Sequence, residues 1–328
     1  MDCPIDENEW AVSRVRAFSL MQMAYHLRHG RLHFPRLLAC LSLPMCQIQD
    51  VAELNVSEPC IKNERRGDGA FQVREGISDA YETHPTLWKV HAQTQRAMQT
   101  SVNAYARIIT GKAHQARGIL ARSSRTHYHR LLSFNANSQL ASFTEHPSIG
   151  ASSLHNVRLN EQKHEAAWTL WTNSTFGLLC HWMHASKQAP GRGKLTWTTR
   201  WTVPTLDVRQ LTDEQLAAAE RIFAELKSYR MLPYNECRYD EWRHVLDARL
   251  LSEVLGITDE ETHRAMQNLR EMLCDEPTIA GTKLEKNFCN LEKERAKFDI
   301  AGTAEGDAAA LATQQLKLRM AGIWLPEC

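Results

Sequence analysis

The sequence predicts an α+β protein in which a mixed, basic part precedes an all-helical, acidic part. Residues 1–206 hold 23 Lys and Arg against 15 Asp and Glu, a net charge of +8, whereas residues 207–328 hold 16 against 23, a net charge of −7. Short alternating apolar segments occur before residue 207, and helical periodicity with capping sequences follows it. We therefore expect an N-terminal helix and irregular region (1–84), a basic α/β domain (85–206) and an acidic helical domain (207–328).

The first region begins with a predicted helix over 8–28, where apolar residues recur every three to five positions. Residues 40–83 are expected to be irregular, with a turn at Gly-Asp-Gly. A second helix is expected to start at Pro85, because proline favours the first position of a helix.

The basic domain contains further predicted strands and one very apolar helix. RLLSFNANSQLASF (130–143) predicts two short strands around a polar turn, and HPSIGASS after it predicts a loop. Residues 160–186 predict a helix whose tryptophans lie in the core. The loop KQAPGRGK follows, and LTWTTRWTV (195–203) alternates as a strand that Pro204 ends.

The acidic domain predicts helices throughout. Thr212-Asp-Glu-Gln and Thr258-Asp-Glu-Glu match the capping box that opens a helix. A helix around Trp242 is expected between them, and two weaker helices are expected at about 282–298 and 308–322.

Composition and cysteine spacing predict a cytoplasmic protein that does not enter a membrane. No apolar run approaches the roughly 18 residues of a membrane span, and the acidic start MDCPIDENEW is unlike a signal peptide. Nine cysteines without a CxxC pair predict reduced thiols rather than disulfides or metal ligands. In that compartment Asn173-Ser174-Thr175 is not a glycosylation site.

The familiar catalytic and cofactor motifs are missing or incomplete. GRGK (191–194) lacks the earlier glycine and the Ser or Thr after the lysine that a nucleotide-binding P-loop needs. HEAAW (164–168) has tryptophan where a zinc protease has its second histidine. The motifs GxSxG, GxGxxG and Asn-Pro-Pro-aromatic do not occur. We therefore expect no cofactor, no metal ion, no catalytic residue and no enzymatic activity of this chain on its own.

Two long stretches, 83–144 and 166–206, contain no Asp or Glu. Solvated surfaces usually mix both signs of charge, whereas a polyanion penalises every nearby carboxylate. This pattern predicts a nucleic-acid surface on which Tyr128 could stack on a base. The expected contact residues are Lys112, Arg117, Arg122, Arg125, His127, Tyr128, Arg130, Arg192, Lys194 and Arg200.

The order of elements between 160 and 228 resembles a known family. AAWTLWTNSTFGLL, a basic loop, a strand, the Val-Pro turn TVPTLDV and LTDEQLAAAERIFAELK follow one another. This succession resembles the C-terminal target-recognition region of adenine-N6 DNA methyltransferases and of type I restriction specificity subunits. The stretch HPTLWKVHAQTQRAM is similar to methylase-associated proteins of bacterial defence loci.

The resemblance implies DNA recognition rather than catalysis. It implies structural helix positions for Asn173 and Ser174, and DNA contacts for Arg192, Lys194 and Arg200. The S-adenosylmethionine site and the Asn-Pro-Pro-Tyr motif of the family are missing, so another chain would have to supply them.

The leading hypothesis is a non-catalytic target-recognition subunit of a methylation-linked restriction or phage-defence system. It would bind DNA, with double-stranded DNA favoured, and a protein partner such as a separate methylase chain through its helical part. Two alternatives stay open: an adaptor that binds protein only, and a metal-dependent nuclease subunit.

Overall fold

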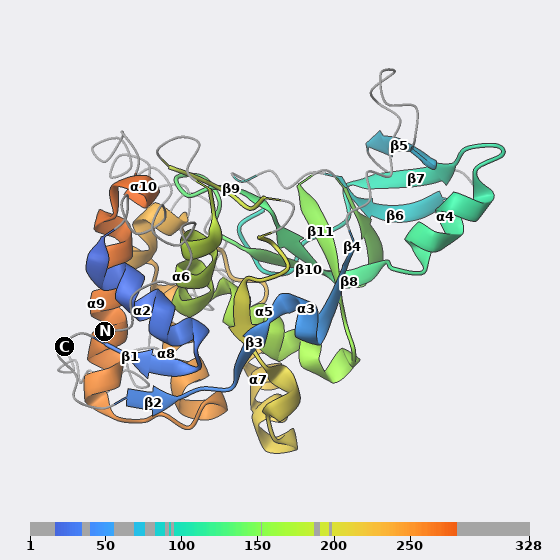
Figure 1. Cartoon of the computed structure of the whole chain (residues 1–328). Helices are drawn as coiled ribbons and strands as arrows, with labels where there is room; N and C mark the ends of the chain where they lie inside the picture. Colours follow the sequence, from blue (N-terminus) through green and yellow to red (C-terminus); the bar gives the residue numbers. More distant parts are fainter. Residues whose placement is uncertain are drawn as a thin grey trace, which may run out of the picture. The chain divides into compact units, whose positions relative to one another are not determined.

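The fold is α+β, as the sequence predicts (Figure 1). The computed structural model describes residues 17–34, 40–55, 69–75, 83–88, 92, 95–151, 153–186, 191–196 and 199–280.

A seven-stranded sheet occupies the middle of the chain, in the order β4–β11–β8–β10–β6–β7–β5. Neighbouring strands are antiparallel except β10 and β6, which are parallel. The strands are β4 (Ala52–Asn55), β5 (Phe71–Glu75), β6 (Thr83–Leu87), β7 (Ala104–Ile108), β8 (Ser124–His129), β10 (Ala141–Gly150) and β11 (Leu154–Leu159). Three two-stranded ladders accompany the sheet: β1 (Arg31–His33) with β2 (Cys40–Ser42), β3 (Met45–Gln47) with β13 (Pro204–Leu206), and β9 (Leu131–Ser133) with β12 (Arg192–Lys194).

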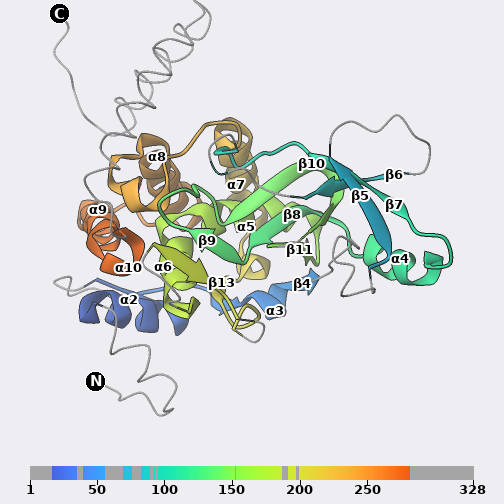
Figure 2. The same ribbon diagram turned by 90° about the horizontal axis from the view of Figure 1, so that it is seen from above.

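Helices gather at one end of this sheet, and β5, β6, β7 and α4 lie at the other (Figures 1 and 2). The last strand, β13, ends at Leu206, and the described residues after it form only helices and turns. The helices are α2 (Phe18–Arg28), α3 (Ile48–Val51), α4 (Ala113–Leu120), α5 (Glu165–Asn173), α6 (Thr175–His184), α7 (Asp213–Leu226), α8 (Glu241–Arg249), α9 (Glu260–Asp275) and α10 (Pro277–Ala280).

Two apolar cores hold these elements together. The larger contains Trp168, Trp171 and Trp182, which are at most 1% exposed, so their predicted core position is confirmed. The same core takes Leu206 and Leu216 from either side of the predicted boundary at 206/207. The smaller core lies between α4 and the strands β5 and β7.

Two predictions in the first half of the chain are wrong. Pro85 lies inside strand β6 instead of starting a helix. β10 pairs only with Thr86 and Leu87, so the missing N–H of Pro85 falls outside that ladder, where a sheet tolerates proline. The region 40–83, expected to be irregular, contains β2, β3, α3, β4 and β5. Their pairing partners lie far away in the sequence, which local composition does not reveal.

The predicted strand over 195–203 is also wrong. Residues 199–202 form a turn, and the strands β12 and β13 lie before and after it. The hydroxyl of Thr199 accepts a hydrogen bond from the backbone N–H of Thr196 at 3.0 Å. Such local bonds offer the backbone an alternative to strand pairing. Pro204 therefore begins β13 instead of ending a strand.

Two short strands were expected in 130–143. β9 and the first residues of β10 confirm them, but the loop expected at HPSIGASS is wrong. β10 continues to Gly150, with a bulge between Phe143 and Ser148. The bulge interrupts the alternation, which explains why the sequence resembles a loop here.

The predicted helix over 160–186 is a pair of helices, α5 and α6, separated at Ser174. The hydroxyl of Ser174 accepts from the N–H of Gly177 at 3.3 Å and caps α6. A Cβ at Gly177 would collide with the backbone of Thr172. The tight junction between the two helices therefore requires glycine at this position.

Asn173 connects the helix pair to the sheet. Its amide oxygen accepts from the N–H groups of Leu140 (2.9 Å) and Ala141 (3.1 Å). Its amide nitrogen donates to the carbonyls of Ala141 (2.9 Å) and Thr169 (3.0 Å). The buried amide thus uses its full hydrogen-bonding capacity. These contacts confirm the structural position expected for Asn173 and leave no room for a glycan.

The helix caps after residue 207 follow the sequence closely. The capping box of Thr212 and Gln215 is confirmed, with N···O distances of 3.2 and 2.8 Å. The second cap lies one residue later than expected, because Asp259 accepts from the N–H of Thr262 at 2.8 Å. The helices expected at 282–298 and 308–322, and the first part of the helix expected over 8–28, lie outside the described residues.

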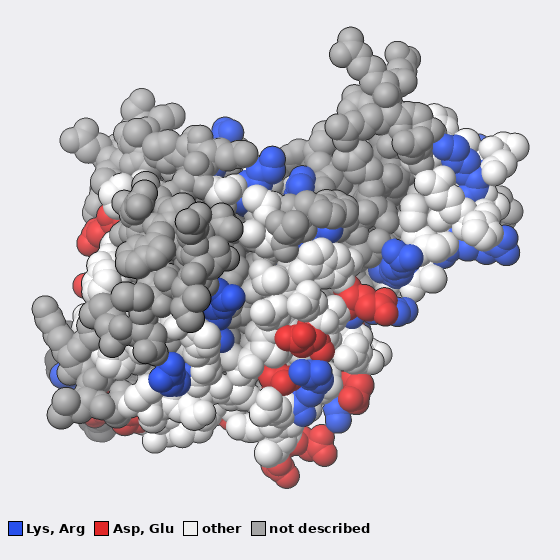
Figure 3. Space-filling view, in the orientation of Figure 1, with Lys and Arg blue, Asp and Glu red and all other residues white. Residues whose placement is uncertain are grey.

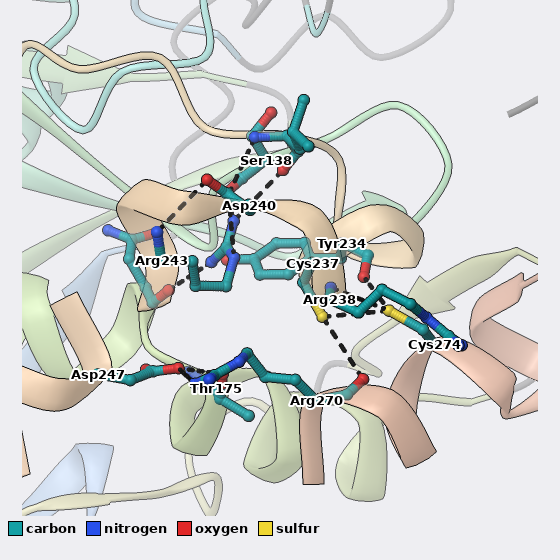
Figure 4. Close-up of polar contacts among 12 residues, drawn as sticks. Ser138, Thr175, Tyr234, Cys237, Arg238, Asp240, Arg243, Asp247, Arg270 and Cys274 are labelled. Atoms are coloured by element: carbon teal, nitrogen blue, oxygen red, sulfur yellow. Dashed lines mark hydrogen bonds and ion pairs between the residues drawn. The ribbon is translucent and has the colours of Figure 1, made fainter. Parts of the chain in front are cut away.

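A buried ionic network joins the sheet, the helix pair and the helical region (Figure 4). The guanidinium of Arg243, on α8, donates to the carbonyls of Asn173 (2.6 Å) and Ser138 (2.7 Å). It lies 3.4 Å from the carboxylate of Asp240 and stacks 4.3 Å above the ring of Tyr234. Burial raises the pKa of Asp240, which Arg243 partly offsets. All of these side chains are buried.

A second buried pair lies beside it. Asp247 accepts from the N–H of Thr175 (2.9 Å) and forms an ion pair with Arg270 of α9 (2.8 Å).

Cys237 and Cys274 face each other with 3.4 Å between their sulfur atoms, and the hydrogen bond from Cys237 lowers the pKa of Cys274 to about 7.

The five described cysteines are free thiols, in line with the prediction. Within the described ranges, no group of three or more His, Cys, Asp or Glu side chains is arranged to hold a metal ion. None of the helices in those ranges combines the length and the apolar character needed to cross a membrane.

The first stability prediction concerns Arg243. Arg243→Met removes the charge but keeps most of the side-chain volume, so the buried Asp240 loses its ion-pair partner and two carbonyls lose their donor. We expect the free energy of unfolding to fall by about 3–5 kcal/mol in a urea titration. Arg264→Met on the exposed face of α9 is the matched control and should change it by less than about 0.5 kcal/mol. Equal effects of the two variants would contradict the anchoring role.

Two buried histidines of β8 should make stability depend on pH. Burial lowers the pKa of His127 to about 4 and that of His129 to about 3. In the unfolded chain these groups titrate near 6.5, so below that pH the unfolded state binds more protons. The stabilisation is therefore complete above pH 6.5 and is lost as the pH falls toward the folded-state values.

Each histidine should cost about 2 kcal/mol of stability between pH 7 and pH 5. His129→Gln, which can still bond to Ser142, should remove about that amount of the pH dependence in urea titrations at the two pH values. His146→Gln in an exposed part of β10 should leave the dependence unchanged. An unaltered slope for His129→Gln would refute this explanation.

Candidate nucleic-acid interface

Exposed and half-buried basic side chains form two groups at the two ends of strand β8. The first, here called the α4 group, consists of Arg107, Lys112, Arg117 and Arg122. The second, the ladder group, consists of Arg130, Arg192 and Lys194. Figure 3 shows blue atoms near β9 and over β7 and α4 without red atoms among them, whereas red and blue atoms are mixed around α3 and α7.

The α4 group is positioned by the connection between β7 and β8. Gly111 has a positive φ of 84°, which turns the chain out of β7 and into the helix. Ala116 is the buried residue of α4, so the basic side chains occupy the outer turns. Arg107 and Arg117 are exposed, and no carboxylate of the described residues forms an ion pair with either.

The ladder group is positioned by the pairing of β9 with β12. Arg192 lies opposite Ser133, Gly193 opposite Leu132, and Lys194 opposite Leu131. A Cβ at Gly193 would lie 2.7 Å from the ring of Phe134. Glycine is therefore what allows β12 to lie directly on this ring, and it explains the GRGK sequence without a nucleotide. Arg130, Arg192 and Lys194 form no ion pair with a described carboxylate.

The two groups lie at opposite ends of β8, a strand of six residues between Arg122 and Arg130, which corresponds to about 20 Å.

Three of the predicted contact residues are buried, and a fourth is half-buried in an ion pair. Tyr128 is 2% exposed, and its hydroxyl lies 2.8 Å from Nδ1 of His181. His127 is fully buried and bonds to Ser148 at 2.9 Å. Burial of the ring corrects the expectation that Tyr128 stacks on a base.

Arg125 and Arg200 are the other two. Arg125 donates to Glu165 at 2.8 Å and lies 5.0 Å above the ring of Phe143. Burial raises the pKa of Glu165 and Arg125 counteracts the rise. Arg200 is 1% exposed, 5.0 Å from the ring of Trp201. Arg200 is therefore buried, and Arg125 is half-buried and engaged by Glu165. The charge pattern of the sequence does not distinguish such positions from exposed ones.

His155 is a candidate site residue that the sequence did not indicate. It lies on β11 opposite Tyr128 and is 1% exposed. Burial lowers its pKa to about 3, with further lowering by Arg200 and Arg130. The register of β11 on β8 places it next to the strand that leads into Arg130, and no local motif encodes this register.

Comparisons with known proteins give little guidance. No protein-family model and no curated protein sequence matches the chain. Among solved structures, the chain is similar to the type IIG restriction endonuclease BpuSI, with a TM-score of 0.48 and 13% sequence identity over 71% of this chain. The similarity covers 31% of that endonuclease, so the chain spans less than a third of its length. A similarity this distant does not determine a function.

Substitutions of Arg125 and Arg117 should have different effects on the free energy of unfolding. Arg125→Gln leaves Glu165 partly buried without its cation, so the free energy of unfolding should fall by about 1–3 kcal/mol. Arg117→Gln on exposed α4 should change it by less than about 0.5 kcal/mol. Urea titrations of both variants measure this, and a larger loss for Arg117 would contradict the assignment.

Proposed function

We propose that this chain binds double-stranded DNA as a non-catalytic target-recognition subunit of a methylation-linked restriction or phage-defence system. The observation that supports it most is the pair of basic groups flanking β8, in which the exposed Arg107, Arg117 and Arg192 form no ion pair with a described carboxylate. A protein surface without a polyanion partner gains nothing from excluding carboxylates over such a distance.

The two groups are suited to phosphate contacts. Arginine and lysine that neutralise phosphates set the affinity and the register of a protein on DNA, whereas contacts to base edges set the sequence preference. The ladder group is the part of the proposed interface nearest to base edges, because β12 is a short strand with Arg192 exposed on it. The restriction or defence setting rests on the sequence resemblance of 160–228 described above.

The acidic helical region is proposed to bind a protein partner. α7 and α9 present exposed carboxylates such as Glu214, Glu220 and Glu261, which would repel DNA and would attract a basic protein surface. A separate methylase chain is the partner that the missing catalytic motif suggests.

Electrophoretic mobility shifts across a salt series test the DNA interface. Because each neutralised phosphate releases counterions, about six contacts predict a loss of roughly a thousandfold in affinity between 50 and 200 mM salt. Arg192→Glu with Lys194→Glu should weaken binding at every salt concentration and lower the slope of log affinity against log salt by about 2. Arg117→Gln should lower the slope by about 1.

The matched control is Arg221→Glu with Arg264→Glu, which reverses two exposed arginines on α7 and α9 and should leave DNA binding unchanged. A flat salt response of the unaltered chain would overturn the proposal. Magnesium-dependent cleavage of the same DNA, abolished by EDTA, would favour the nuclease alternative. Loss of partner assembly with intact DNA affinity in the ladder variant would favour the protein-only adaptor.

A further inference from the structure

Two buried thiols lie against each other where a 3-10 helix meets α9. Cys237 belongs to η3 (Tyr234–Tyr239), and Cys274 belongs to the last turn of α9. Both residues are at most 1% exposed, and a dashed line joins their sulfur atoms, 3.4 Å apart, in Figure 4. A disulfide bond is about 2.05 Å long. The two sulfur atoms therefore need to approach each other by only about 1.4 Å to form one.

The surroundings of Cys274 favour a thiolate. Its sulfur accepts a hydrogen bond from the backbone N–H of Arg238 at 3.4 Å. The hydrogen bond from Cys237 and the groups of Arg238 lower the pKa of Cys274 to about 7, although burial opposes the change. At Cys180, which is also buried, burial raises the pKa to about 12. Because the thiolate is the nucleophilic form of cysteine, Cys274 is the thiol of this pair that reacts first.

The pair is buried but lies close to the surface along the chain. Arg238 and Asp275 directly follow the two cysteines, and their side chains form an ion pair while being 24% and 68% exposed. Asp275 is also the last residue of α9, and the ends of helices open more readily than their middles. A small oxidant such as hydrogen peroxide suits this position better than a bulky disulfide reagent.

The two thiols stand on the segments that support the two strands of the β9–β12 ladder. On the side of η3, the N–H of Asn235 donates to the carbonyl of Phe134, directly after β9, at 3.0 Å. On the other side, α10 follows α9 after a single residue. There the carbonyl of Thr278 accepts from the N–H of Gly191, directly before β12, at 3.0 Å. A bond between the thiols would therefore tie both supports together.

We infer that Cys237 and Cys274 are a peroxide-sensitive dithiol that closes to a disulfide and fastens η3 to α9 at the support of the ladder. The thiolate of Cys274 attacks one oxygen of hydrogen peroxide and the O–O bond breaks. The leaving hydroxide takes up the proton that Cys274 had lost and departs as water, which leaves a sulfenic acid on Cys274. The thiol of Cys237 then attacks that sulfur, the S–S bond forms, and the S–O bond breaks to release a second water.

The reaction is balanced by its two reactants. Two thiols lose two electrons in total, and one hydrogen peroxide gains them to become two waters. A small dithiol reductant returns the pair to its reduced form by thiol–disulfide exchange. The disulfide can be measured without DNA, so its failure would not be a failure of the proposed function.

Peroxide treatment of the folded full chain, followed by alkylation and peptide mapping by mass spectrometry, tests the site. We expect a cross-link between Cys237 and Cys274 that dithiothreitol reverses, while the buried Cys180 stays reduced. Because the cross-link joins residues 37 positions apart, Tm should rise by roughly 5 °C. Absence of this cross-link while the exposed Cys40 becomes oxidised overturns the inference.

Serine variants separate the roles of the two thiols. In Cys237→Ser the sulfenic acid of Cys274 has no thiol to attack it, so dimedone should label Cys274 and peroxide should no longer raise Tm. Cys274→Ser should leave Cys237 unlabelled. Cys40→Ser is the matched control and should form the cross-link like the unaltered chain. Labelling of Cys237 instead of Cys274 would contradict the assigned roles, and the cross-link in the unaltered chain remains measurable if a variant does not fold.

Amide hydrogen exchange tests the fastening of the ladder supports. In the cross-linked chain, exchange at the N–H groups of Asn235 and Gly191 should slow by about tenfold relative to the reduced chain. Exchange in the middle of α7 should stay the same. Unchanged exchange at both Asn235 and Gly191 would show that the disulfide does not act on the ladder and would overturn this part of the inference.

Discussion

The buried guanidinium of Arg243 is the contact on which the arrangement of the described chain depends. It binds a carbonyl of the loop after β9, a carbonyl at the junction of α5 and α6, and the carboxylate of Asp240. Removing a partner of a buried charge is strongly destabilising, because the charge is then left uncompensated. The loop that follows β9, the helix pair and the helical region must therefore take up their positions together. Because β9 pairs with β12, the same contact also fixes the base of the ladder group.

Local patterns in the sequence predicted the parts of this fold that local forces determine. The apolar helix of 160–186, the capping box of Thr212 and the α+β class all follow from spacing and from hydrogen bonds within a few residues. The sequence did not predict strands whose partners are remote. Pro85 is an example: the pairing of β6 with β7 and β10 outweighs the preference of proline for the first position of a helix. The 195–203 segment failed for the opposite reason, because threonine hydroxyls close a local turn within an alternating pattern.

The sequence predicted where basic residues accumulate, but it did not predict which of them are buried. The absence of Asp and Glu indicated where basic residues accumulate, and Arg117 and Arg192 are indeed exposed. Nothing in composition shows that Arg125 faces Glu165 across 40 residues, or that Tyr128 points into the tryptophan core. β8 is an inner strand in which the consecutive residues 126–129 are all buried, so both of its faces are covered and the usual alternation of interior and surface does not apply. The burial of His155 is equally invisible in the sequence, because it depends on the pairing of β11 with β8.

The two acid-free stretches are separate in sequence but meet in the structure. β9 belongs to the first and β12 to the second, and their ladder brings both together beside the turn that carries Arg200. The exclusion of carboxylates holds along the sequence and not in space. Glu276 of the helical region accepts from the hydroxyl of Thr278 at 2.8 Å, and the carbonyl of Thr278 accepts from the N–H of Gly191, directly before β12. The basic ladder is therefore built beside an acidic residue that only the tertiary fold brings there.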